Sequence, residues 1–362
     1  MIDFDGVDKN ARIVVAMSGG VDSSTTVALL KEEGYKNVVG MTLLLHENNL
    51  EKGIVSKDQN VKADCLRVAE TLSVEHHFVD IKDLFMEEII NPFLDAYLHG
   101  ITFNPCVKCN RVIKFGKMLD EAKKLNADIL TTGHYIKWGR GSDGKGAIYR
   151  GKNSNRDQSY FLSQVKKESL PYIRFPLYSY TKDMVRAEAE RLGIHVAQKK
   201  SSADICFAGI GSYNDILKTQ GKEIIPGDIV DMQGNVIGRH EGIHNFTVGQ
   251  RKGVGIGGVG NPLYVMKIDA ENHRIIVGNK EDLQVREIFI SNVNWLGDGD
   301  FDFAEKKLFA KVRGSQPLKE AEVYPLGEGK ARVVFKENIF GVAPGQICAF
   351  YDEEQLLGGG YI

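Results

Sequence analysis

The sequence predicts an α/β domain built on a parallel, doubly wound sheet, followed by a small central β-rich domain and a C-terminal β-barrel. Strand-like and helix-like segments alternate over the first half of the chain, whereas short strands separated by Gly, Pro and Asn turns take over beyond about residue 215. A chain of 362 residues with 43% hydrophobic residues can bury two or three cores. We therefore expect domains at residues 1–212, 213–280 and 281–362.

The first half of the chain is predicted to consist of parallel βαβ units. The apolar run Ile13-Val14-Val15 is typical of a buried strand, and the helix-like segment after it ends near Gly34. By the same criteria we expect strands at 12–17, 38–45, 75–79 and 127–134, and helices at 22–34, 60–73, 84–98 and 110–125. In such units the helices cover both faces of the sheet.

The second half shows the alternating pattern of antiparallel strands. Gln233-Gly234-Asn235 and Glu328-Gly329 each stand between alternating apolar residues and predict two hairpins. A small barrel is therefore expected to close the chain.

Composition narrows the class of protein. The net charge of −2 argues against a globally basic nucleic-acid binder but leaves room for a local basic patch. No run approaches the roughly 18 apolar residues of a membrane helix, and MIDFDGVDKN lacks the features of a signal peptide. Five irregularly spaced cysteines do not make a disulfide framework. We expect a soluble, cytoplasmic protein whose special cysteines are catalytic or metal-binding.

The stretch AMSGGVDSS, residues 16–24, lies where the first strand turns into the first helix. Such a turn gathers backbone N–H groups and the positive end of a helix dipole around one point, which favours an anion. Glycine allows close approach of a phosphate, and the serine hydroxyls add donors. The loop is not a Walker A motif. A simple tight turn capped by Asp22 or Ser23 remains the alternative.

Two further glycine patterns resemble nucleotide motifs. Residues 139–145 satisfy GxxxxGK, but Gly146 replaces the required Ser or Thr, and the segment links IKW to AIYR as a polar hairpin. Residues 253–258 satisfy GxGxxG but run into a strand rather than a helix, so we interpret them as a loop.

Three cysteines stand in contexts that suggest reactivity. Cys106 and Cys109 form one C-x-x-C just ahead of a predicted helix, whose N-terminal end would lower a thiol pKa, and Cys206 follows a pair of lysines. A single C-x-x-C is poor evidence for zinc. From the residues alone, a buried structural role is as good an interpretation as a reactive one. Cys65 and Cys348 are assigned to packing.

Taken together, these segments resemble the bacterial tRNA 2-thiouridylases, or tRNA-uridine 2-sulfurtransferases, of the ATP pyrophosphatase superfamily. The resemblance covers nearly the whole chain. It is carried, in order, by AMSGGVDSS, GMTLLL, NPCVKCNRVIKF, LTTGHY, RDQSYFL, SADICFAG, PGDIVD, HNFTVGQRKGVGIGG, PGQICAFY and LGGGYI. It implies an N-terminal fold like that of the adenine nucleotide alpha hydrolases.

The resemblance also implies a two-stage reaction on the wobble uridine of tRNA. The uracil C2 oxygen attacks the α-phosphate of ATP, with Mg²⁺, to give an adenylate and pyrophosphate, and sulfur then replaces AMP at C2. The implied ATP-binding residues are Ala16, Met17, Ser18, Gly19, Gly20, Val21, Asp22, Ser23, Met41 and Gly133.

The sulfur chemistry implied by the resemblance uses the cysteines. A persulfide on Cys206 delivers sulfur and Cys109 is the second thiol, so that turnover leaves a Cys109–Cys206 disulfide. The chain departs from the family's usual pattern at Cys106, where many members carry an aspartate. Cys106, Cys109 and Cys206 holding an iron–sulfur cluster is therefore an alternative route.

The same resemblance implies tRNA contacts. They are Asn104, Pro105 and Cys106 at the target base, His134, Arg156, Asp157 and Gln158 near the anticodon arm, and Arg313, Gly314 and Gln346 from the barrel. Gly314 replaces the aromatic residue usual in the family, and His134 could equally be a structural strand-end histidine. Lys108, Arg111, Lys114 and Lys117 recur every three positions beside the cysteines and are interpreted as phosphate contacts.

The expected partners are a tRNA with a wobble uridine and a persulfide donor, either a cysteine desulfurase or a sulfur-relay protein. An ATP-dependent ligase or amidotransferase would share SGGVDSS and is the rival function. It would not need the two remote cysteine contexts.

Overall fold

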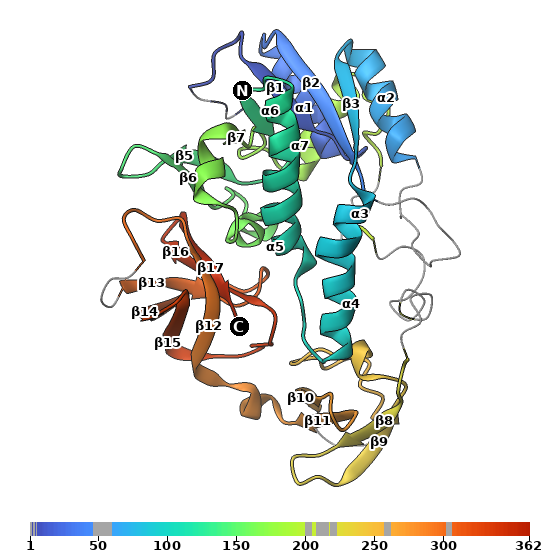
Figure 1. Cartoon of the computed structure of the whole chain (residues 1–362), viewed down its shortest axis with the longest axis vertical. Helices are drawn as coiled ribbons and strands as arrows, with labels where there is room; N and C mark the ends of the chain where they lie inside the picture. Colours follow the sequence, from blue (N-terminus) through green and yellow to red (C-terminus); the bar gives the residue numbers. More distant parts are fainter. Residues whose placement is uncertain are drawn as a thin grey trace.

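A computed structural model describes residues 2, 4, 6–45, 60–199, 205–207, 217, 223–256, 262–301 and 306–362. Figure 1 shows three parts of the molecule arranged along its long axis. A parallel sheet with its helices lies at one end, a small mixed sheet lies at the other, and a barrel packs beside the helices between them.

The parallel sheet has five strands in the order β3-β2-β1-β4-β7. They are β1 (Arg12–Ala16), β2 (Asn37–Leu44), β3 (Glu75–Asp80), β4 (Ile129–Thr131) and β7 (Ile173–Arg174). β1 pairs in parallel with β2 on one side and with β4 on the other, so the strand order reverses at β1. Ligands of such sheets bind in the crevice beyond the carboxyl ends of the strands at this reversal. The sequence predicts four of these strands and misses β7.

Helices cover both faces of the sheet, as predicted. Ile13 and Val15 of β1 pack with α1 (Val21–Glu32), α2 (Val61–Leu72) and α7 (Lys182–Arg191). Val14, which points the other way, packs with α6 (Met118–Lys124). The alternation follows from the two-residue period of a strand, and burial on both faces explains why the strand is a continuous apolar run.

Two helical runs contain π-helical segments. The first comprises α3 (Lys82–Phe85), η2 (Met86–Ile90) and α4 (Asn91–Leu98), and the second comprises α5 (Pro105–Cys109), η3 (Asn110–Lys117) and α6. The second run was expected from about residue 110 but begins at Pro105, which suits a first helical position because it has no N–H to satisfy. Cys106 and Cys109 therefore lie inside the helix, not ahead of it.

The small sheet has the order β10-β11-β8-β9. Its strands are β8 (Gly227–Val230), β9 (Val236–His240), β10 (Tyr264–Asp269) and β11 (Arg274–Gly278). β8 and β9 are antiparallel across residues 231–235, which confirms the first predicted hairpin. A Cβ at Gly100, just after α4, would lie 2.6 Å from Ile268 of β10, so α4 meets this sheet without a gap.

The chain ends in a closed barrel of six strands. They are β12 (Val285–Trp295), β13 (Lys306–Lys311), β14 (Lys319–Gly327), β15 (Lys330–Ile339), β16 (Ile347–Asp352) and β17 (Gln355–Tyr361). Pairing of β12 with β17 completes the circle. Glu328 and Gly329 both have positive φ, as the predicted hairpin between β14 and β15 requires.

A hairpin from the first half of the chain extends the barrel sheet. β5 (Lys137–Arg140) pairs with β6 (Gly146–Tyr149), and β6 pairs with β17 through Leu356 and Ile148. This is the polar hairpin predicted from residues 139–145. Short 3₁₀ helices complete the fold: η4 (Ser154–Arg156), η5 (Ser159–Leu162), η6 (Lys167–Tyr172), η7 (Ile243–Asn245) and η8 (Lys280–Leu283). Within the described residues no helix is long and apolar enough to span a membrane.

Candidate active site

The glycine loop at residues 16–23 adopts the geometry of an anion site. Gly19 has φ +70°, and Gly20 is the extended N-cap of α1. The Ser23 hydroxyl accepts the amide of Ser18 at 3.2 Å and donates to Gly20 O at 3.3 Å, so it ties the two ends of the loop together. No side chain caps the first amides of α1. A helix N-terminus with uncapped amides beside a glycine turn favours phosphate.

Asp22, in the first turn of α1, is held by two residues that the sequence analysis did not assign. Lys182 Nζ donates to both carboxylate oxygens at 2.7 Å, and the Tyr135 hydroxyl donates to Oδ1. Lys182 is positioned by the first turn of α7, where Thr181 caps the helix through Met184 N. Burial and the Asp22 carboxylate raise the pKa of Tyr135, so this phenol stays protonated and keeps donating.

The walls of the loop are close-packed backbone. A Cβ at Gly133, just after β4, would lie 2.9 Å from Asp22 Cβ and 3.1 Å from Ser23 N, so only glycine fits there. Met17 N donates to Met41 O at 2.8 Å, which joins the loop to β2, and the Met41 side chain is fully buried. The expected ATP-binding residues thus meet at the carboxyl ends of β1, β2 and β4, where strand order reverses.

A second set of charged residues contacts the glycine loop, and its carboxylate, Asp64, lies on α2. Lys199 Nζ donates to Gly19 O at 3.1 Å and to Asp64 Oδ2 at 2.5 Å, and His195 Nε2 lies 3.1 Å from Asp64 Oδ1. The hydrogen bonds from Lys199 and His195 hold the pKa of Asp64 below its ordinary value despite partial burial. Lys199 therefore fixes the glycine that turns the loop.

The three expected catalytic thiols are near one another. All five cysteines are free, and Cys109 packs in one apolar cluster with Ile205 and Phe207, the neighbours of Cys206. Cys106 and Cys206 keep exposed surface and Cys109 is half-buried, yet desolvation by the surrounding protein raises the pKa of Cys109 to about 12, raises that of Cys206 to about 11 and also raises that of Cys106. The expected lowering of the thiol pKa by a helix end is wrong, because desolvation outweighs the dipole at these thiols.

Lys114 connects the thiols to the nucleotide loop. Its charge favours the thiolate of Cys106, Cys109 and Cys206, and it also acts on His134. His134 follows Gly133 directly, and Gly133 packs on the backbone of Asp22. The charge of Lys114 therefore acts both on the thiols and on the residue next to Gly133.

Three of the four residues of the expected basic stripe have partners within the protein. Arg111 donates to Gln164 O at 2.8 Å, Lys108 pairs with Glu88 at 3.0 Å, and Lys117 pairs with Glu121 at 2.7 Å. In the π-helical segment, residues three apart do not stay on one face. Lys114 is the member whose charge favours the thiolate forms of Cys106, Cys109 and Cys206.

The expected target-base residues lie at the start of the second helical run. Asn104 is the N-cap of α5 and accepts Val107 N at 3.3 Å, and Pro105 is buried beneath it. Gln346 of the barrel donates to Thr102 O at 2.8 Å, and Thr102 N donates to Pro344 O at 2.8 Å. The barrel therefore holds the segment that leads to Cys106.

The remaining expected tRNA contacts differ in exposure. Arg156 is exposed, whereas the Gln158 side chain accepts Tyr135 N at 2.8 Å. Asp157 is buried, receives Gly151 N, Ser159 N and the Ser159 hydroxyl, and lies 3.4 Å from Lys311 Nζ of the barrel. The Asp157 carboxylate is therefore used inside the protein.

Three more of these residues make internal contacts. Arg313 donates to Gly341 O and to Val248 O at 2.7 and 2.8 Å, which joins the barrel to the central domain. A Cβ at Gly314 would lie 3.3 Å from the Tyr160 ring. His134 is buried, with Nδ1 2.6 Å from the Thr132 hydroxyl, and burial holds its pKa well below the ordinary value.

The described residues do not form a metal centre. Among them, no three His, Cys, Asp or Glu side chains are arranged to hold a metal ion. Cys106, Cys109 and Cys206 as placed therefore do not fit the ligand set of an iron–sulfur cluster. Mg²⁺, which usually keeps several waters and is held through substrate phosphates, would arrive with ATP.

The fold defines an α/β nucleotide-binding enzyme that has a glycine loop where the strand order reverses and whose chain continues into a β-barrel. Family models match in the same order. They are described as the tRNA methyl transferase HUP domain over residues 11–210, the tRNA methyl transferase PRC-barrel domain over 214–279, and the aminomethyltransferase beta-barrel domain over 285–362.

Curated relatives match along the whole chain. The tRNA-specific 2-thiouridylases MnmA of Bradyrhizobium sp. (strain BTAi1) and Parvibaculum lavamentivorans are each 44% identical, covering 100% of this chain and 93% of theirs. The chain belongs to the tRNA-specific 2-thiouridylase family. A solved U34-tRNA thiolase, NcsA from Methanococcus maripaludis with its [4Fe-4S] cluster, covers 61% of this chain and 66% of its own at 19% identity and a TM-score of 0.38.

Proposed function

We propose that this protein thiolates the C2 position of the wobble uridine of tRNA in an ATP-dependent reaction, in the cytoplasm. The observation that supports the proposal is a glycine loop at the point where the strand order reverses, on a chain that also holds three thiols and His134 under the influence of the charge of Lys114. Adenylation and sulfur transfer act on the same carbon in succession, so a nucleotide loop and a thiol cluster must face one substrate.

In the first step the uracil C2 oxygen attacks the α-phosphorus of ATP. A P–O bond to C2 forms, the bond to the β-phosphate oxygen breaks, and pyrophosphate leaves. The uncapped amides of α1 and the Ser18 and Ser23 region would bind the phosphates. Lys182, on Asp22, supplies positive charge at the same end of the helix.

In the second step a persulfide on Cys206 delivers its outer sulfur to C2, and AMP leaves with the C2 oxygen. The resulting C2–S–S–Cys206 disulfide is attacked by the Cys109 thiolate at the Cys206 sulfur. The S–S bond breaks, 2-thiouridine is released, and a Cys109–Cys206 disulfide remains. A persulfide-bearing protein must supply the sulfur, and a dithiol must reduce the disulfide.

The free protein is not prepared for thiolate chemistry at neutral pH. Desolvation by the surrounding protein raises the pKa of Cys109 and of Cys206, so both thiols are protonated at neutral pH, and Lys114 opposes this effect only in part. We propose that bound substrate completes the environment that ionises these thiols. Cys106 lies with them and, as a thiol, does not supply the carboxylate that many relatives have at that position.

The test is pyrophosphate release from ATP, with and without an unmodified tRNA carrying a wobble uridine. In wild type we expect release to require tRNA. Cys206→Ser should retain tRNA-dependent release and lose 2-thiouridine formation. Cys348→Ala removes a thiol buried in the barrel and should retain both activities. Release that is independent of tRNA would overturn the substrate and favour a ligase or amidotransferase.

A further inference from the structure

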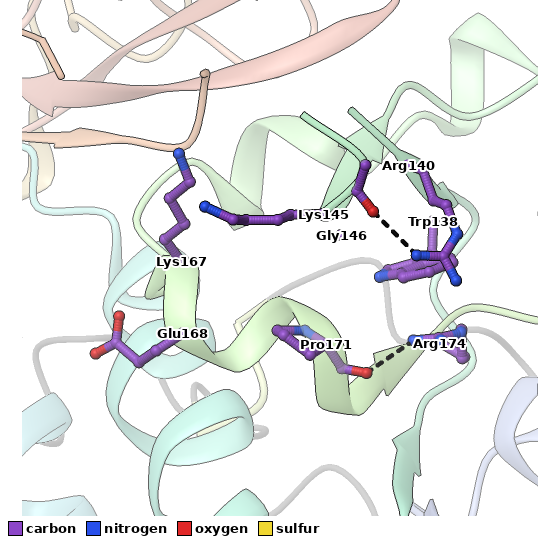
Figure 2. Close-up of a pocket in the computed structure, with 9 residues that line it drawn as sticks. Trp138, Arg140, Lys145, Gly146, Lys167, Glu168, Pro171 and Arg174 are labelled. Carbon is purple, nitrogen blue, oxygen red and sulfur yellow. Dashed lines mark hydrogen bonds between the residues drawn. The ribbon is translucent and has the colours of Figure 1, made fainter. Parts of the chain in front are cut away.

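A pocket on the β5–β6 hairpin is lined by residues that the reaction does not use. It measures ≈ 520 Å³, within the size range of ligand clefts. Its lining is Trp138, Arg140, Gly144, Lys145, Gly146, Lys167, Glu168, Pro171 and Arg174, which includes four cations and one carboxylate. Figure 2 shows Lys167 and Glu168 on one side and Trp138 with Arg140 on the other.

The aromatic side of the pocket is built around Trp138. The Arg174 guanidinium lies 3.4 Å from the centre of the indole ring, and that of Arg140 lies 5.9 Å from it. The indole N–H donates to Leu170 O at 2.8 Å, which fixes the ring. A Cβ at Gly146 would lie 3.0 Å from the indole nitrogen and 3.1 Å from Leu170 O. Gly146, which spoils the Walker-like pattern, is therefore needed for this arrangement.

Three of the lining cations donate hydrogen bonds to backbone carbonyls. Arg140 donates to Gly144 O at 2.9 Å, Arg174 donates to Ile173 O at 2.7 Å, and Lys167 donates to Gly297 O, so these acceptors are neutral carbonyls. Lys145 lies 3.6 Å from Asp143 and is otherwise largely exposed. Four cations stand against the carboxylates of Glu168 and the adjacent Asp143, so the lining has an excess of positive charge on a protein whose net charge is −2, which favours an anionic ligand.

We propose that this pocket binds a backbone phosphate of the tRNA at a position outside the anticodon loop. The inference rests on the proposed function. Arginine is well suited to phosphate because its planar fork matches the oxygens, and stacking on Trp138 pre-orients it. Lys145, on the hairpin tip, adds a mobile point charge. Phosphate contacts of this kind set the register of an RNA without reading its sequence.

The pocket is separate in the chain from the thiol cluster but fixed to the same framework. β6 pairs with β17 of the barrel, and Lys167 binds the carbonyl of Gly297 after β12. A phosphate held here would therefore orient the tRNA relative to both the α/β domain and the barrel.

The experiment measures binding of full-length unmodified tRNA as a function of salt for wild type and for Arg140→Ala/Lys145→Ala. We expect the double variant to bind several-fold more weakly at low salt, with a salt slope reduced by about one for each phosphate that the variant no longer neutralises. The matched control is Lys137→Ala/Lys152→Ala, which removes two cations that do not line the pocket, one on β5 and one just after β6. Equal slopes in the two double variants would overturn the proposal.

Further measurements distinguish tRNA from other ligands of the pocket, and failure of the pocket proposal from failure of the proposed function. The KM for ATP should be unchanged in Arg140→Ala/Lys145→Ala, and a raised KM would assign the pocket to a free nucleotide instead. If the variant thiolates tRNA more slowly and only a higher concentration of the sulfur donor restores the rate, the pocket would be assigned to binding of the donor protein. The isolated anticodon stem-loop should bind wild type and variant equally. If wild type thiolates no tRNA, the proposed function fails, whereas normal wild-type activity with an unchanged variant slope removes only the pocket.

Discussion

Lys182 Nζ lies 2.7 Å from both carboxylate oxygens of Asp22, so the ammonium group of α7 is fixed at the N-terminal end of α1. The Lys182 side chain is 10% exposed and that of Asp22 is 32% exposed. The Asp22 carboxylate therefore remains partly accessible in the first turn of α1.

Lys182→Ala should lower tRNA-dependent pyrophosphate release by about 10²–10³-fold, the usual effect of losing one preorganised group at a reacting centre. Tyr135→Phe should have a smaller effect, because it removes one hydrogen bond to Asp22 and no charge. Lys166→Ala, an exposed lysine, is the control. Release by Lys182→Ala within twofold of wild type would show that this lysine only stabilises the helix.

Lys199 and Asp64 should act as one unit on the phosphate loop. Lys199→Met frees Gly19 O, and Asp64→Asn weakens the contact that orients Lys199, so each change should raise the KM for ATP. The double variant should be no worse than the more severe single variant. If the effects of Lys199→Met and Asp64→Asn on the KM for ATP, measured by pyrophosphate release, were additive, the two residues would act independently.

The thiol pKa values predict slow alkylation at neutral pH. A raised pKa keeps an acid protonated, so reaction of Cys206 with iodoacetamide should increase about tenfold per pH unit up to a pH near its pKa of about 11. Lys114→Met removes the cation that favours the thiolates and should shift the profile to higher pH. Mass spectrometry of the Cys206 peptide gives the rate, and a plateau below pH 8 would contradict the assignment.

Asp157 should affect stability before it affects tRNA binding. Its side chain is 1% exposed and pairs with Lys311, which is 4% exposed. Asp157→Ala leaves a buried cation and should cost about 3–5 kcal/mol in urea unfolding. The exposed neighbour Arg156→Ala should leave unfolding unchanged and weaken tRNA binding. If Asp157→Ala is as stable as wild type but loses tRNA affinity, Asp157 would be a tRNA contact, as the sequence resemblance implies.

Anaerobically purified protein should contain no iron and show no visible absorption band, because the cysteines as placed do not form a ligand group among the described residues. Iron analysis and absorption spectra of wild type and Cys106→Ser test this directly. Stoichiometric iron that Cys106→Ser abolishes would establish the cluster route instead.

The sequence predicts much of the fold because local signals carry it. Apolar runs predict strands, a glycine at the end of a periodic segment predicts the end of a helix, and turns such as Glu328-Gly329 predict hairpins. Each of these signals lies within a few residues of sequence. β7 has two residues, too few for any periodic signal. The early start of the second helical run depends on Pro105 and on the Asn104 cap, whereas the sequence pattern places the helix start at the periodic segment after them.

The site is harder to predict because its partners are distant in the chain. Lys182 and Asp22 are 160 residues apart, and Lys199 and Gly19 are 180 apart. The motifs identify the loop and the cysteines, but no local pattern shows which lysine meets which carboxylate. The direction of the thiol pKa shifts also depends on burial, which only the folded chain provides.

The pairing of β6 with β17 has a consequence for synthesis of the chain. The hairpin emerges from the ribosome long before its partner strand, so one edge of it must stay unpaired while the central domain and most of the barrel are made. During that interval the α/β domain carries an open strand edge. Chaperone protection of residues 137–149 on stalled nascent chains, ending once residues 355–361 have emerged, would be the signature of this late closure.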